Sequence, residues 1–220
     1  MGYKKIMFII GLGIVSLLPG TGVSQSPKEV PAKISEGKVG SATEPEEDFQ
    51  KARESFLKKD LKASAAAIRK GAAYFMKLQT QVEEKREQTF YASQEAMSKL
   101  ADRVEKGAVK SVQELDRVFA QTFHALAQYH YLKTMESWAK KETTKAGQEL
   151  EAASAALARG AKQAGEKMKG KVGSVIEDSH LLAEKLIQGA GWADTEAEKQ
   201  IKALGVEIDK LGKKVKASKK

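Results

Sequence analysis

Apolar residues recur at helical spacing through most of the chain, from about residue 46 to residue 217. The first periodic stretch covers 46–58, where Phe49, Ala52 and Phe56 fall on one side of a helix. The charged residues Lys58-Lys59-Asp60 then interrupt the pattern, and the carboxylate of Asp60 is suited to cap a helix that starts behind it. The pattern therefore predicts a short first helix followed at once by a second one.

Two longer periodic stretches follow, over 60–106 and from Val112 to about Leu157. Gly107 ends the first of them, and Ser111 with Glu114 has the spacing of a capping box that opens the second. At 1.5 Å per residue each stretch would be about 70 Å long. Because the two are nearly equal in length and joined by a short loop, we expect an antiparallel helical hairpin.

The helix that begins at Val112 carries two apolar stripes, which predicts contact with two partner helices at the centre of a bundle. One stripe consists of Val112, Leu115, Phe119, Phe123, Leu126 and His130, and the other of Ala120, Ala127, Tyr131 and Trp138.

Small residues dominate the next part of the chain, so helices there can approach closely. The stripe consists of Ala146, Leu150, Ala153, Leu157, Ala161, Ala164 and Met168. Four glycines lie between residues 160 and 173, and each weakens a helix by about 1 kcal/mol relative to alanine. We expect a break near 160 or 170–173, while the pattern leaves open whether 112–168 forms one helix or two.

Two more helices are predicted, over 174–188 and from Thr195 onwards. Apolar residues of the last one repeat at heptad spacing, at Ala197, Ile201, Leu204, Ile208, Leu211 and Val215. Since this seam is too short for an independent coiled coil, we expect it to dock on the bundle. The fold class predicted is all-α: an elongated antiparallel helical bundle over 46–217, with a long central helical hairpin, preceded by a disordered N-terminal tether.

Composition supports this prediction. All four prolines lie in the first 45 residues, and the chain has no asparagine and no cysteine. Proline and asparagine are the residues that most often break helices or form turns. Without cysteine no disulfide can stabilise the fold, so packing has to supply the stability.

The N-terminal segment is typical of a secretory signal. Lys4 and Lys5 precede 13 uncharged, mostly apolar residues, and small residues follow near Ser24. We expect a signal peptide over 1–24, cleaved between residues 20 and 26, and a disordered linker over 25–45. The expected location is periplasmic or secreted, in a bacterium; the alternative is a membrane anchor formed by an uncleaved signal.

The net charge of +9 comes partly from the C-terminal end, where Lys210 to Lys220 hold six lysines and no acid. We expect 218–220 to be a basic tail, and we expect no nucleic-acid partner for an exported chain of this kind. Weak contact with an anionic membrane is possible through four lysines near the end: Lys210, Lys213, Lys214 and Lys216.

His130 and His124 are the candidate cofactor ligands. His130 falls on the main apolar stripe, and a core histidine bonded to a neighbour is the favoured interpretation; the alternative is a haem or metal pocket inside the bundle. Met76, Met97 and Met135 could supply a second haem ligand, although methionine more often fills gaps. We therefore expect no cofactor.

Glu177 and His180 form the candidate metal pair, because three-residue spacing places both on one helix face. A helical di-iron site needs two such Glu-x-x-His pairs and two further glutamates, which the chain does not offer. His180 also lies four residues before Glu184, and an ordinary surface ion pair between these two residues is the favoured interpretation.

No signature of a nucleophile or a zinc protease occurs, so we expect no enzyme. The leading hypothesis is an exported helical bundle of the bacterial envelope that acts by protein contact or self-association, as a scaffold, assembly or stress-protective protein. The alternatives are a peripheral lipid-binding protein and a bundle that carries metal or haem near His130.

Overall fold

The computed structural model describes residues 45–79, 84–166, 168 and 170–217, all within one compact unit. Seven helices make up the regular structure of these residues: α1 (Glu46–Leu57), α2 (Leu61–Gln79), α3 (Glu84–Glu105), α4 (Val112–Ala139), α5 (Thr143–Gln163), α6 (Lys171–Gln188) and α7 (Asp194–Ala217). The predicted all-α bundle is confirmed. The predicted signal peptide, linker and basic tail lie outside the described residues, apart from Pro45.

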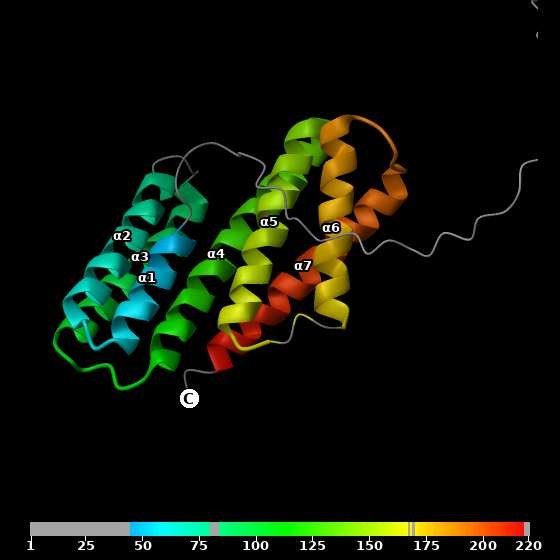
Figure 1. Cartoon of the computed structure of the whole chain (residues 1–220). Helices are drawn as coiled ribbons and strands as arrows, with labels where there is room; N and C mark the ends of the chain where they lie inside the picture. The colour runs from blue at the N-terminus through cyan, green and yellow to red at the C-terminus, as the bar shows by residue number, and fades with distance from the viewer. Residues whose placement is uncertain (1–44, 80–83, 167, 169, 218–220) are drawn as a thin grey trace, which may run out of the picture. The chain divides into compact units, whose positions relative to one another are not determined.

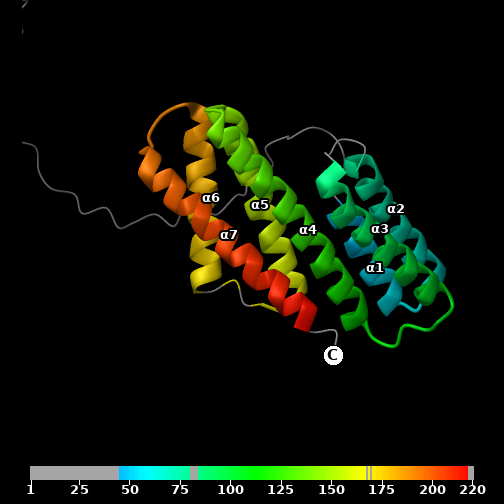
Figure 2. The same ribbon diagram turned by 180° about the vertical axis from the view of Figure 1, so that it is seen from behind.

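The fourth helix is the centre of the bundle, as its two apolar stripes predict. It packs against α1, α3, α5 and α7, while α2 packs on α1 and α3, and α6 on α5 and α7. Figures 1 and 2 show α4 between the group α1–α3 and the group α5–α7. Between α1 and α4, Phe49 stacks on Phe119 with ring centroids 4.2 Å apart and meets Phe123 edge-on at 5.4 Å.

The predicted central hairpin is present, but its arms are shorter than expected. The α3 and α4 helices pack against each other across the loop at 106–111. The arm predicted over 60–106 is divided into α2 and α3, and the chain between them at 80–83 lies outside the described residues. The arm predicted from 112 to 157 ends at Ala139, and α5 begins at Thr143 and packs back against α4.

A repeated turn explains where α4 ends. Residues 54–60 read ESFLKKD and residues 136–142 read ESWAKKE, and both segments end a helix in the same way. Lys59 and Lys141 adopt left-handed backbone with φ of 61° and 60°, and the next residue donates its N–H to the carbonyl five positions earlier. This is the hydrogen-bond pattern of a Schellman motif. The repeat therefore marks the turns from α1 to α2 and from α4 to α5.

The other helix ends follow the glycines and the polar caps. Gly107, Gly165 and Gly189 follow α3, α5 and α6 with positive φ, so the predicted break falls at 164–170, between the two positions expected. Asp60 caps α2 as predicted, accepting a hydrogen bond from the Ala63 N–H at 3.0 Å. At α4 the predicted capping box is replaced by another bond: Ser111 makes no side-chain cap, and Glu114 accepts a hydrogen bond at 2.9 Å from the N–H of Lys110, one residue before the N-cap.

The last helix docks on the bundle, as its heptad seam predicts. Its seam residues are at most 4% exposed: Ala197, Ile201, Leu204, Ile208, Leu211 and Val215. The α5 stripe is equally buried from Ala146 to Ala161, whereas Met168, its predicted last member, is 39% exposed. No helix in the described part of the chain is both long enough and apolar enough to cross a membrane.

Candidate functional site

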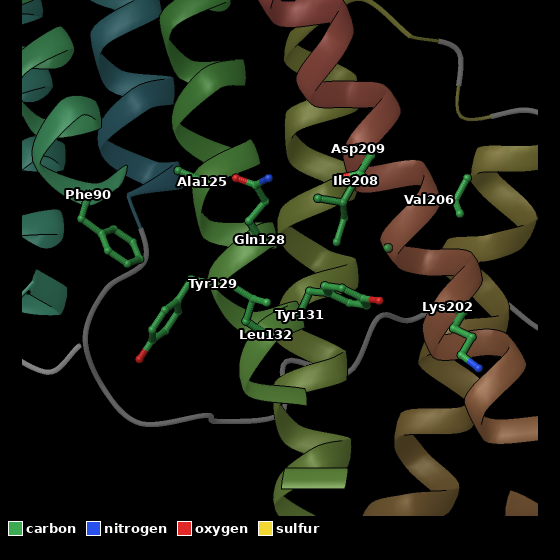
Figure 3. A pocket seen from close by; sticks show the side chains of 11 residues that line it. Phe90, Ala125, Gln128, Tyr129, Tyr131, Leu132, Lys202, Val206, Ile208 and Asp209 are labelled. Atoms are coloured by element: carbon green, nitrogen blue, oxygen red, sulfur yellow. The ribbon is translucent and has the colours of Figure 1, made fainter. Parts of the chain in front are cut away.

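A cavity of about 490 Å³ opens between α3, α4 and α7, and we call it the α4 groove. Its lining is mostly apolar and aromatic, with a few polar groups, which is the composition expected of a binding site. Gly205 lines it together with the residues labelled in Figure 3: Phe90, Ala125, Gln128, Tyr129, Tyr131, Leu132, Lys202, Val206, Ile208 and Asp209.

Two glycines of α7 set the distance between α7 and α4. Gly205 and Gly212 lie one heptad apart, and they face Tyr131 and His124, which are also one heptad apart on α4. A Cβ atom at Gly205 would lie 2.5 Å from the Tyr131 hydroxyl oxygen, and one at Gly212 would overlap the His124 ring. The helices are therefore antiparallel and close, with both rings laid over the α7 backbone.

The floor and walls of the groove come from three helices. Ala125, Gln128 and Leu132 form one stripe of α4 and line the floor, while Val206 and Asp209 line the α7 wall. On the α3 side, Phe90 meets Tyr129 edge-on with ring centroids 5.1 Å apart. Leu132 and Val206 are 43% and 50% exposed. The groove thus offers apolar surface to solvent beside polar groups.

Burial shifts the pKa values of Tyr131 and His124, the two side chains that face the α7 glycines. Burial, with the charge of Asp209, raises the pKa of Tyr131. Burial lowers the pKa of His124 and the charge of Lys216 adds to this, while Asp209 and a backbone hydrogen bond at Ile208 oppose it. The Nε2 atom of His124 is buried and has no hydrogen-bond partner among the described residues. Such an environment favours a neutral imidazole that packs between α4 and α7.

His130, the other histidine predicted as a ligand, lies on a different side of α4. Its Nδ1 atom is 2.8 Å from Oε2 of Glu149 on α5, and both side chains are about one-fifth exposed. The cavity beside it is only about 10 Å³, room for about one water molecule. Of the three methionines proposed as second ligands, Met97 is buried in the core, and the other two are exposed. His130 is therefore a partly buried histidine that is bonded to Glu149 of the neighbouring helix.

Glu177 and His180, the predicted metal pair, form no hydrogen bond with each other. Glu177 is exposed, and Nδ1 of His180 lies 2.5 Å from Oε2 of Glu151 on α5. This hydrogen bond raises the pKa of His180, and the predicted partner Glu184 adds a smaller electrostatic effect. Among the described residues no three His, Asp or Glu side chains gather to hold a metal ion.

The four lysines predicted to contact a membrane divide into two pairs. Lys210 binds the buried Glu207 at 2.7 Å, and Lys214 binds Glu166 at 2.9 Å. Lys213 and Lys216 are exposed and form no ion pair with the described residues.

The sequence did not predict the groove as a site, although Tyr131 was placed on an apolar stripe. The signal that marks it is the pair Gly205 and Gly212 inside a helix, at the spacing of the heptad seam. Val206 and Leu132 are a second part of this signal, because they are apolar residues that lie outside the buried stripes. A comparison of the chain with models of protein families, with curated proteins and with solved structures finds no match.

Proposed function

We propose that this protein is an exported, non-enzymatic helical bundle of the bacterial envelope, which acts by binding another protein at the α4 groove. The observation that carries the proposal is the groove itself, an apolar cavity of about 490 Å³ with Leu132 and Val206 exposed beside it. Exposed apolar surface of this kind, rimmed by polar groups, is typical of interaction sites.

The contacts that His130 and His180 make with glutamates of α5 support a binding protein over an enzyme. His130 and His180 are engaged by Glu149 and Glu151, and both contacts join α5 to a neighbouring helix. These contacts give both histidines a structural role in helix packing. The export part of the proposal depends on the N-terminal pattern of Lys4, Lys5 and the apolar run behind them.

The packing of α7 favours a protein partner over a lipid bilayer. An amphipathic helix binds a membrane by burying its apolar side in the lipid. In α7 that side is buried in the bundle, with Ile201 and Ile208 each 1% exposed, so it is not accessible to lipid.

Site-specific photo-crosslinking in the producing cell tests the proposal. A photoreactive residue at Leu132 or Val206 should capture a protein of the envelope fraction. The same residue at Leu57 or Leu181, which are 62% and 52% exposed on α1 and α6, serves as the matched control. Equal capture at all four positions, or none at the groove, would refute the binding role. Recovery of the unprocessed chain from the cytoplasm would refute export.

A further inference from the structure

We infer that the α4 groove selects an acidic amphipathic helix, which places its apolar side on the α4 floor and its carboxylates along the lysines of α7. This inference rests on the proposed function and adds the chemical class of the partner. It depends on the shape of the groove and on the distribution of charge along its α7 wall.

The shape suits a helix. Ala125, Gln128 and Leu132 follow one another along α4, while Lys202, Val206 and Asp209 follow one another along α7. In each series the first and last residues are seven positions apart, which is about 10 Å along the helix axis. A valley between two packed helices accepts the apolar side of a third helix through residues spaced i, i+3, i+4 and i+7.

The α7 wall is mainly positive. The exposed stripe that contains Val206 also contains Lys199, Lys202, Lys213 and Lys216, and its acids are Glu198 and Asp209. The Nζ atom of Lys202 lies 3.8 Å from Oε2 of Glu198. Because both side chains are exposed, this ion pair is weak. The charge of Lys216 reaches the α4–α7 seam, since it contributes to the lowered pKa of His124. The charge complementary to this wall is that of a row of carboxylates.

Asp209 gives the inference a test of sign. It lies on the α7 wall of the groove, and it forms no ion pair with the described residues. For an acidic helix Asp209 is a like charge, and its removal strengthens binding. For a basic helix it is the anchor, and its removal weakens binding.

The experiment uses two synthetic helical peptides of about five turns with the same leucine face, one with glutamate and one with lysine on the polar face. Fluorescence anisotropy measures their binding to the mature protein. We expect the glutamate peptide to bind about tenfold tighter at low salt, with the preference reduced in roughly 0.5 M salt.

Three variants complete the test. Asp209→Asn should tighten binding of the glutamate peptide about two- to fivefold, the size expected for one exposed charge. Lys213→Glu with Lys216→Glu should weaken it tenfold or more. The control is Lys62→Glu with Lys171→Glu, which makes the same change of charge at exposed positions of α2 and α6 and should alter binding less than twofold. Circular dichroism verifies that each variant is folded.

Several results would overturn the inference: equal or tighter binding of the lysine peptide, weaker binding by Asp209→Asn, or an equal loss in the control. Binding to anionic phospholipid vesicles that needs Lys213 and Lys216, with no binding of the glutamate peptide, would assign the wall to a membrane surface instead. None of these results affects a partner crosslinked at Leu132, so failure of the inference is distinguishable from failure of the proposed function.

Discussion

Gly147 lies where α5 packs closely on α6, and its replacement by alanine sets two opposing effects against each other. A Cβ atom at this position would lie 2.8 Å from the carbonyl oxygen of Ala183 and 2.9 Å from side-chain carbons of both Leu186 and Ile187. Two of these three atoms, the carbonyl oxygen and the Leu186 Cβ, are fixed by the α6 backbone. Rotation of a side chain cannot relieve those contacts, so the two helices have to separate.

The magnitudes decide the sign. Alanine in place of glycine inside a helix stabilises it by about 0.8–1.0 kcal/mol. Carbon atoms in contact prefer a separation of about 3.5–4.0 Å, so the new methyl group is about 0.6–1.1 Å too close to its neighbours. Overpacking of this kind costs about 1–3 kcal/mol, and a fixed backbone favours the upper end. Gly147→Ala should therefore lower the free energy of unfolding by about 1–2 kcal/mol.

Urea unfolding, followed by circular dichroism, measures this loss as a lower midpoint at an unchanged slope. In a heating experiment the melting temperature should fall by about 2–8 °C. Thr144→Ala, at an exposed position of the same helix, is the control and should be neutral or stabilising by a few tenths of a kcal/mol. A Gly147→Ala protein as stable as the wild type, or more stable, would refute the close packing of α5 on α6.

Three further predictions concern the histidines and the aromatic core. Because the pKa of His124 is lowered in the folded state, the contribution of His124 to stability is complete above its unfolded pKa of about 6.5 and is lost as the pH falls through the folded pKa. The drop in melting temperature between about pH 7.5 and 5.5 should therefore be smaller in His124→Gln than in the wild type. An equal drop in both proteins would contradict this prediction. Glu151 raises the pKa of His180, so the stabilisation by this pair is complete below about pH 6.5 and is lost as the pH rises through the folded pKa of His180. Glu151→Gln should remove the pH dependence of the melting temperature between these two pKa values. A profile of melting temperature against pH that is parallel to that of the wild type would contradict this prediction. The Phe49 side chain is 1% exposed, so Phe49→Ala should lower the free energy of unfolding in urea by about 3–5 kcal/mol. The Leu57 side chain is 62% exposed, so the control Leu57→Ala should change this free energy by less than about 0.5 kcal/mol. Similar losses for the two variants would refute the packing of α1 on α4.

The helix boundaries show which signals in the sequence were sufficient. Gly107 and Asp60 mark a helix end and a helix start where they were expected, because each satisfies a backbone requirement within its own turn. The end of α4 was missed, since Lys141 replaces the usual glycine in the left-handed position. The repeat of ESFLKKD as ESWAKKE carried that information, because the first copy already ended a predicted helix.

The candidate residues show the opposite case. Spacing alone paired His180 with Glu177 or Glu184 on its own helix, yet its hydrogen-bond partner is Glu151 of α5. The α4 groove likewise joins residues as far apart in the sequence as Phe90 and Asp209. Contacts between helices depend on crossing angle and axial offset, which local periodicity does not encode.

By itself the sequence determined that the chain is helical and which residues form the buried stripes, because helical periodicity and the absence of proline after Pro45 act within a few residues. Tertiary structure decided how those helices are paired and what remains exposed. Gly205 and Gly212 let α7 lie on His124 and Tyr131, and this close approach leaves Leu132 and Val206 beside an open cavity. The physical reason is that the apolar side of each helix follows from its own sequence, whereas the surface left uncovered depends on how the helices of the described residues pack together.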